Sequence, residues 1–275
     1  MARWRELGRH ITALNDIGTI LSAMRSLAFI EMRRLGDGAA RRVETLAAIH
    51  RAIDHLVASY PAARPSSGPE RDVIVLVGSE RGLCGDFDAV VASHEYATQD
   101  HGDGLRIAVG SRLGQLLDER GIAHRALTGA AVIEDVPDVL SNMVAALRNS
   151  AHDEHEHTVG LVVVHHDDDG AVRAERVLPI PVSAISPPAL LARPLLQLTP
   201  PRLYEMLVEY YVFAALHVAL LASLLAENRR RQDQMSSALD RLHLRVDDLD
   251  RHRRQARQEA ITEEIEIILL GDLPR

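Results

Sequence analysis

Two clusters of histidines and carboxylates are the part of the sequence most capable of chemistry. The first cluster has histidines at 152, 155 and 157 with acidic residues between them, and the second is residues 165–170, His-His-Asp-Asp-Asp-Gly. Imidazole and carboxylate groups are common zinc ligands, so either cluster could hold a metal. Both clusters fall where loops are expected, and the Asp-Gly pair is typical of a hairpin turn. We therefore predict no metal and no cofactor for this chain.

A glycine-containing turn follows the first predicted strand, at residues 79–85 (Ser-Glu-Arg-Gly-Leu-Cys-Gly). Turns in which glycines meet a helix N-terminus can bind phosphate. This turn matches neither the dinucleotide fingerprint nor the P-loop, and the chain contains no lysine for a phosphate contact or a Schiff base. Nucleotide binding is therefore not expected. Cys84 lies near a predicted helix start, which can lower a thiol pKa, although a structural role is more common.

The composition is typical of an ordered protein with an aliphatic core. The chain has 275 residues, 47% hydrophobic and 25% charged, and only 3% are aromatic. The net charge of −8 argues against nucleic-acid binding, and the single cysteine cannot form an internal disulfide. We expect no signal peptide, since the first residues lead into an amphipathic stretch. The most apolar segment, residues 210–225, is too short to predict a membrane span.

Long helical patterns occupy both ends of the chain. Residues 3–60 carry one apolar stripe and predict one long helix, bent near Gly36. The stripe consists of Leu7, Ile11, Leu14, Ile17, Leu21, Met24 and Ala28. Residues 202–270 contain neither proline nor glycine and predict a helix of roughly 100 Å. From about Glu227 onward its stripe is narrow and heptad-like, which needs one partner helix, so we predict an antiparallel coiled coil of the two ends.

Strand and helix patterns alternate between the two ends. Buried strands are expected at 72–78, 105–109 and 159–164, and an edge strand at 172–180. Helices are expected at 87–98, 113–120 and 139–147. The fold class is therefore α/β: a Rossmann-like middle domain with a long antiparallel coiled coil of the terminal helices. The predicted division is an N-terminal helix 1–60, a linker 61–70, an α/β domain 71–198 and a C-terminal helix 199–275.

Three sequence blocks resemble the gamma subunit of F-type ATP synthases. They are residues 20–28 (Ile-Leu-Ser-Ala-Met-Arg-Ser-Leu-Ala) with Met-Arg-Arg at 32–34, the turn at 79–85, and residues 256–265 (Ala-Arg-Gln-Glu-Ala-Ile-Thr-Glu-Glu-Ile). The last block is similar to the family's Ala-Arg-Gln-Ala-Ala-Ile-Thr-x-Glu-Ile, and order and spacing agree over nearly the whole chain. Some positions depart from the family pattern: Ser22 and Glu31 replace lysines, and Arg253-Arg254-Gln255 replaces Tyr-Asn-Lys. The departures indicate a divergent member of the family and are compatible with an alternate F-type ATPase.

This resemblance implies a non-catalytic central rotor that couples ion translocation through a membrane ring to ATP synthesis or hydrolysis at beta subunits. The implied partners are the alpha and beta subunits of the catalytic hexamer, the epsilon subunit and the ring of c subunits, with no nucleic acid and no direct membrane insertion. The implied location is peripheral, on the cytoplasmic face of the bacterial plasma membrane.

The resemblance also assigns the residues expected to contact partners. Those matching family contacts with the beta subunit are Met24, Arg25, Arg257, Gln258, Thr262 and Glu264. Ile265, Ile268 and Leu269 would form an apolar tip that turns inside a hydrophobic sleeve. Without the resemblance, the alternatives are a core methionine for Met24, a solvated helix face for Arg257 and Gln258, and a helix end packed on its own fold for the tip.

A second interpretation belongs to a different class of protein. The α/β block could be a small-ligand enzyme or sensor that dimerises through its terminal helices. It would need a polar pocket at the carboxyl ends of the strands. Nucleotide binding by the isolated chain would favour this interpretation, and co-purification with a hexameric ATPase would exclude it.

Overall fold

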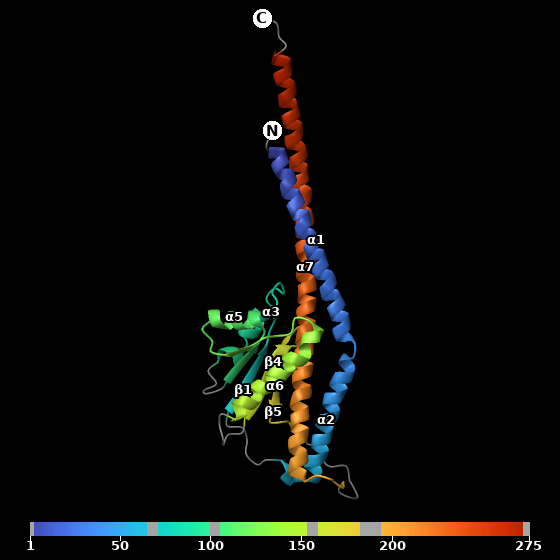
Figure 1. The fold of residues 1–275 in the computed structure, drawn as a ribbon, viewed down its shortest axis with the longest axis vertical. Helices are drawn as coiled ribbons and strands as arrows, with labels where there is room; N and C mark the ends of the chain where they lie inside the picture. The colour runs from blue at the N-terminus through green and yellow to red at the C-terminus, as the bar shows by residue number, and fades with distance from the viewer. Residues whose placement is uncertain (1–2, 65–70, 100–104, 153–158, 182–193, 272–275) are drawn as a thin grey trace. The chain divides into compact units, whose positions relative to one another are not determined.

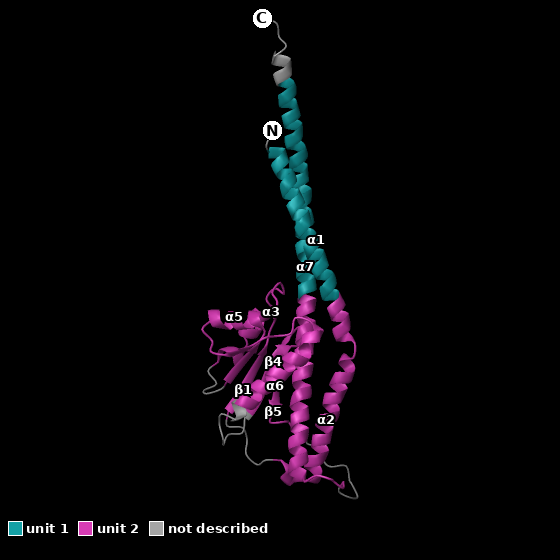
Figure 2. Ribbon diagram, in the orientation of Figure 1, with its two compact units in different colours: residues 1–29, 231–275 teal, residues 30–230 magenta. Residues whose placement is uncertain are grey.

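The fold is described from a computed structural model, which covers residues 3–64, 71–99, 105–152, 159–181 and 194–271. The side chains of 150–152, 159 and 267–271 are outside this description. The chain divides into two compact units: unit 1 comprises residues 1–29 and 231–275, and unit 2 comprises residues 30–230 (Figure 2). Helices α1 (Arg3–Gly36) and α7 (Pro200–Gly271) each contribute to both units.

A five-stranded sheet forms the centre of unit 2. Its strands are β1 (Arg71–Val77), β2 (Leu105–Val109), β3 (Arg125–Leu127), β4 (Val159–His166) and β5 (Val172–Leu178). The order is β3-β2-β1-β4-β5, with β5 antiparallel to β4 and the other neighbours parallel. The register places Val75 beside Ile107 and Val163. Such an order has its strand-order reversal between β1 and β4, as in Rossmann-like folds.

Helices cover both faces of this sheet, as Figure 1 shows. Alternate residues of each strand point to opposite faces, so Ile74 packs with α3 (Phe87–Ala92) and α5 (Ser111–Glu119). Val75 packs instead with α6 (Val136–His152) and with α7. The two short helices beside these are α4 (Glu95–Thr98) and the 3₁₀ turn at Ile133–Asp135. The predicted α/β class is confirmed.

The first helical segment differs in one respect from the single bent helix expected. It consists of two helices, α1 and α2 (Ala39–Ser59), separated at Asp37 and Gly38. Gly38 has φ of +83°, a left-handed conformation that glycine adopts without strain and that cannot continue a helix. After α2, a 3₁₀ turn at Pro61–Ala63 packs on α2 and α7 around Ile53. Strand β3 was not predicted, because three mostly exposed residues give no periodic signal.

Unit 1 is a pair of antiparallel helices, formed by the first part of α1 and the last part of α7 (Figure 2). A methyl group on Gly8 would lie 3.9 Å from Arg253, whereas one on Gly18 would lie 3.5 Å from Leu242. Because the facing residue number falls on α7 as it rises on α1, the two helices run in opposite directions. The predicted coiled coil is confirmed.

One part of α7 is long and apolar enough to cross a membrane by composition alone, although 39% of that 18-residue window is buried inside the molecule. In unit 2 the helix contributes Leu216, Leu220 and Leu224 to the core against the sheet. The buried core helix of a water-soluble domain has the same composition, so this segment is weak evidence for a span. The prediction that the chain does not insert into a membrane stays a prediction.

Candidate partner-contact site

The seam of the helix pair follows a narrow apolar stripe on each helix. On α7 the buried positions are Met235, Leu239, Leu242 and Leu249. The spacing of three and four residues is the one expected for a two-helix seam. On α1 the stripe differs from the prediction at one position, because Gly18 faces the seam and Ile17 is 48% exposed. With a seam repeat of 3.5 residues, positions 11, 14 and 18 of α1 face the partner helix. The apolar residue at position 17 hides this choice in the sequence, because it looks like the seam residue.

The predicted contact residues lie in two separate groups on this pair. Met24 and Arg25 belong to α1, where Met24 is half-buried and Arg25 exposed. Trp4 lies about 30 Å from Met24 along the helix, at 1.5 Å per residue. Arg257 lies at the level of Trp4, with its guanidinium 5.7 Å from the indole centroid. The two groups could therefore contact one partner only at different heights, or different partners.

The second group consists of Arg257, Gln258, Thr262 and Glu264, and these residues lie on exposed faces of α7. Gln258 and Thr262 are one turn apart, and the Thr262 hydroxyl donates to the Gln258 carbonyl oxygen at 3.0 Å. They line a shallow hollow together with Glu259, Glu263 and Glu266. This face thus presents an amide, a hydroxyl and carboxylates to solvent.

Arg257, Ile261, Glu264 and Ile265 share the neighbouring face by helical spacing, and all four side chains are exposed. The side chains of the predicted tip residues Ile268 and Leu269 lie outside the described residues.

The sequence analysis did not predict a separate exposed apolar stripe on α1. Ile17, Ile20 and Leu27 are 48%, 60% and 63% exposed, and they lie on the same helical face as Met24. Contiguous exposed apolar residues mark interaction surfaces more often than isolated ones do. The signal was present in the sequence as a second stripe of three-and-four spacing, hidden by the stronger stripe beside it.

In unit 2, the turn at 79–85 is built around carboxylates of the chain itself. The Glu80 carboxylate accepts hydrogen bonds from the Ser111 amide at 2.9 Å, the Ser111 hydroxyl at 2.7 Å and the Gly129 amide at 2.8 Å. Ser79 is held similarly, with its amide and hydroxyl donating to Asp88 at 2.7 and 2.6 Å. The Glu80 carboxylate thus occupies the Ser111 amide at the start of α5, and the next amide, of Arg112, donates to the Ser79 carbonyl oxygen at 3.1 Å, so neither is open to a phosphate.

Cys84 in this turn has a structural position. It is buried with Phe87 and Ala226 in a small apolar cluster, and the turn is also tied to α7 by an ion pair between Asp86 and Arg230. Its Sγ lies 3.5 Å from the Ser79 hydroxyl.

The second histidine cluster forms a hairpin between β4 and β5, as predicted. His166 is fully buried and stacks on Phe87 at 3.9 Å between ring centroids. Its Nε2 and Nδ1 lie 3.1 and 3.0 Å from the carbonyl oxygens of Phe87 and Gly170. Since both ring nitrogens face carbonyl oxygens, the histidine is placed for packing and not for ligation.

Within the described residues, no group of three or more His, Cys, Asp or Glu side chains could hold a metal ion. The first histidine cluster lies outside the described residues, apart from the backbone of His152. The expectation that it holds no metal stays a prediction.

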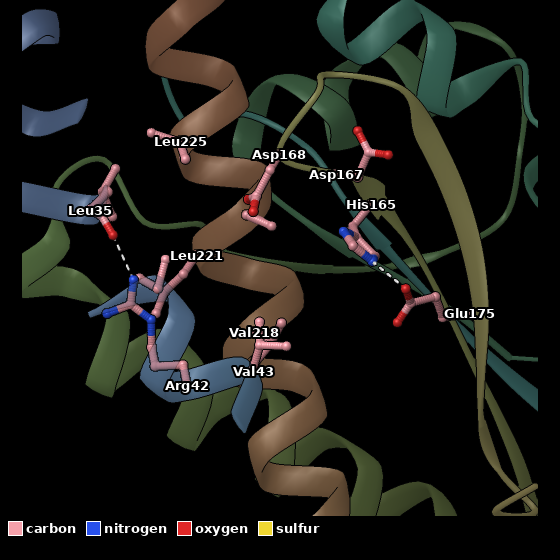
Figure 3. A pocket seen from close by; sticks show the side chains of 12 residues that line it. Leu35, Arg42, Val43, His165, Asp167, Asp168, Glu175, Val218, Leu221 and Leu225 are labelled. Atoms are coloured by element: carbon pink, nitrogen blue, oxygen red, sulfur yellow. Dashed lines mark hydrogen bonds and ion pairs between the residues drawn. The ribbon is translucent and has the colours of Figure 1, made fainter. Parts of the chain in front are cut away.

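A small cavity lies between the β4–β5 hairpin, α2 and α7 (Figure 3). His165 lines it, with Nδ1 at 2.8 Å from the His166 carbonyl oxygen and Nε2 at 3.8 Å from Glu175. The interaction with His165 is the main cause that lowers the pKa of Glu175. The cavity holds about 150 Å³ and is mostly lined by apolar side chains such as Leu221. Ligand pockets are usually about 300–1,000 Å³, so this one is too small for a nucleotide.

Comparison with known proteins decides between the two interpretations. A family model described as ATP synthase matches residues 3–271. The chain belongs to the ATP synthase family. The ATP synthase gamma chain of Saccharopolyspora erythraea is 27% identical, over 98% of this chain and 97% of that one. The gamma chain of Frankia casuarinae is 28% identical, over 97% and 96%. The resemblance to gamma subunits is confirmed along the whole chain.

Solved structures agree with this gamma-chain assignment at the level of the fold. A chain of the Euglena gracilis mitochondrial ATP synthase, from a structure of OSCP, F1 and the c-ring, aligns with a TM-score of 0.63. The alignment covers 98% of this chain and 93% of that chain at 14% identity. A chain from the central stalk and c-ring of the Tetrahymena thermophila enzyme aligns at 0.54, covering 80% and 99%. The gamma-chain fold, a coiled coil with a Rossmann-like domain, is thus retained at low identity.

Proposed function

We propose that this chain is the central rotor stalk of an F-type ATP synthase, a subunit without an ATP site of its own. ATP chemistry would take place on beta subunits, and ions would pass through a membrane ring of c subunits. The observation that carries the proposal is the family match from residue 3 to residue 271, which includes both helices of the antiparallel pair.

A rotor has to bias chemically equivalent catalytic subunits into different states, and it can do so only by presenting different faces to them. The helix pair has such asymmetry. One face of α1 is apolar at Ile17, Ile20 and Leu27, whereas the hollow around Gln258 and Glu263 on α7 is polar and acidic. Rotation of this pair would turn the apolar face and the polar hollow past each subunit in sequence, each at its own height along the helices.

The two groups of contact residues would have different tasks. Met24 and Arg25 adjoin the exposed apolar stripe, so we assign them to a beta contact that is mainly hydrophobic. Arg257, Gln258, Thr262 and Glu264 would instead form a reversible polar latch with beta. A guanidinium fork and an amide can bind a carboxylate and a hydroxyl without a covalent link. These assignments rest on the family motif and on the exposure of the side chains on α7.

The end of α7 would serve as a bearing. By the helix register, α7 continues for about 13 residues beyond the level of Arg3, which is roughly 20 Å. Ile265 is exposed on this stretch, and Ile268 and Leu269 follow it at helical spacing. An apolar tip with few directional hydrogen bonds would turn in a hydrophobic sleeve without a deep energy well.

The proposed partners are the alpha and beta subunits, the epsilon subunit and the c ring. The chain would be peripheral on the cytoplasmic face of a bacterial plasma membrane, as part of the membrane-bound complex.

The rival interpretation as a small-ligand protein is not favoured. Glu80 fills the amide groups at the crevice where a phosphate would bind, and the cavity beside His165 is too small for a nucleotide.

The test is reconstitution with the cognate alpha and beta subunits, measuring assembly and ATP hydrolysis on the same sample. One copy of the chain per ring, with turnover that depends on it, supports the rotor. A chain that stays alone, or binds a small ligand instead, overturns it.

Two variants address the latch and the tip. R257A/Q258A removes a charge-assisted bond and an amide bond, so coupled activity should fall about tenfold or more. R241A/Q234A changes the same residue types at exposed positions on α7 and should have little effect.

Removing residues 257–275 should impair coupling while the α/β domain stays folded, as judged by circular dichroism. Tightly coupled activity in that truncation would contradict the role of the tip.

A further inference from the structure

A groove rich in arginine lies between the two helices of unit 1. It is lined by Trp4, Arg5, Gly8, Arg9, Thr12, Arg253, Arg254 and Arg257, and we call it the arginine groove. Among the described residues, its lining has five guanidinium groups and no carboxylate. The chain as a whole is acidic, with a net charge of −8, so this concentration of positive charge is local.

The groove interrupts the apolar seam of the helix pair. Leu249 is a buried seam residue, and the next seam position on α7, four residues later, is Arg253. Opposite it on α1 stands Gly8, whose missing side chain leaves room for the Arg253 stem: a methyl group there would lie 3.9 Å from Arg253 Cδ. A glycine facing an arginine contributes little to seam packing. Gly8 and Arg253 therefore form the base of the arginine groove and add little to the apolar core of the helix pair.

Among the residues that the structure describes, two of the five groove arginines form ion pairs with a carboxylate. Asp250 is shared by two arginines, at 2.6 Å from Arg253 and 3.3 Å from Arg254. Arg5 and Arg257 both lie over the indole of Trp4, at 5.3 and 5.7 Å from its centroid. Cation–π contacts orient these guanidiniums without cancelling their charge. The groove thus holds an ordered set of positively charged donors, which is the arrangement that binds anions.

The dimensions suit a short peptide. From Trp4 to Thr12 the groove extends about 12 Å along α1, which an extended chain covers in about four residues. Guanidinium groups bind carboxylates through paired hydrogen bonds, and several such pairs in a row recognise a row of carboxylates. We propose that the arginine groove binds an acidic polypeptide segment supplied by a subunit of the ring that surrounds the helix pair. The identity of that partner rests on the proposed function, whereas the preference for acidic peptide does not.

The only tryptophan of the chain lies in this groove, so its fluorescence reports binding directly. The full-length chain is titrated with hexaglutamate, with hexaglutamine and with pyrophosphate, in 50 and 300 mM NaCl. We expect a saturable change with hexaglutamate that weakens at least tenfold at the higher salt, because charge attraction is screened. Hexaglutamine should produce no saturable change. Equal responses to the two peptides, or none, would overturn the proposal, and so would pyrophosphate binding as tightly as hexaglutamate.

A pair of variants separates the groove from general charge. R253Q/R254Q should weaken hexaglutamate binding at least tenfold, whereas R241Q/R251Q removes two exposed arginines of the same helix outside the groove and should not. Unchanged binding in R253Q/R254Q would also overturn the proposal. Circular dichroism checks that both variants keep their helices.

The same variants are then assembled with alpha and beta subunits at increasing salt. We expect R253Q/R254Q to assemble with at least tenfold lower affinity than R241Q/R251Q. Equal affinity would contradict the partner assignment. If even the unmodified chain fails to assemble, the proposed function fails, while the peptide titration still decides whether the groove binds acidic segments.

Discussion

Gly18 of α1 packs against Leu242 of α7, and a methyl group at Gly18 would lie 3.5 Å from Leu242 Cδ2. This distance is an ordinary van der Waals contact, so alanine fits. Because glycine weakens a helix interior, G18A should raise the stability of the helix pair by about 1 kcal/mol. G18L overfills the same space and should lower it by about 1–3 kcal/mol. Thermal unfolding followed by circular dichroism at 222 nm measures both, and equal destabilisation by the two would contradict this packing.

Glu80 accepts hydrogen bonds from three donors, two at the start of α5 and one in the loop after β3, which predicts a structural role for its carboxylate. E80A leaves the amides of Ser111 and Gly129 without this acceptor and should reduce the free energy of unfolding by about 2 kcal/mol. E80Q keeps one acceptor oxygen and should cost less. Urea unfolding of the full chain is the measurement, with E119A, an exposed position on α5, as the control. A midpoint shift no larger than that of E119A would refute the role.

His166 is predicted to stabilise the sheet through packing and hydrogen bonding. H166A removes the ring that stacks on Phe87 and leaves a cavity beside two carbonyl oxygens, so we expect a loss of about 3 kcal/mol. H252A alters an exposed histidine of α7 and should change stability by less than about 0.5 kcal/mol. Hydrogen exchange of the β4 amides would show whether the loss is local to the hairpin. Full protection of those amides in H166A would contradict the prediction.

The hairpin should also depend on pH through Asp167. The hydrogen bond from Arg173, assisted by the amides of Ala171 and Asp169, lowers the pKa of the Asp167 carboxyl. Because the folded pKa is lower than the unfolded one, the ionised carboxylate stabilises the fold above the unfolded pKa. That contribution is lost as the pH falls through the folded pKa.

The stability difference between the unmodified chain and D167N should therefore be constant above about pH 5 and shrink below about pH 4. Denaturant titrations at several pH values measure it. A stability difference between the two proteins that grows as the pH falls would contradict the predicted stabilisation by the ionised Asp167 carboxylate.

The sequence by itself determined the elements with a strong repeating pattern. The stripe on α7 and the run of buried residues in β1 and β4 are local patterns. They can be recognised from residues close together in the sequence, because helices and strands repeat every 3.6 and 2 residues. The family blocks, which lie at both ends and after β1, indicated the gamma chain. The two glycines at 36 and 38 indicated a bend in one long helix, whereas the structure has a break at Asp37 and Gly38, where Gly38 adopts a left-handed conformation.

Tertiary structure decided which of these residues meet. The choice of Gly18 over Ile17 for the seam depends on the relative rotation of two helices, which no single stripe specifies. Glu80 binds an amide 49 positions away, at Gly129, because parallel strands bring their carboxyl ends together. The arginine groove likewise combines Trp4 and Arg9 with Arg253 and Arg257, which an antiparallel pair places side by side from opposite ends of the chain. Such sites arise from long-range contacts, so local patterns could name their residues but not their neighbours.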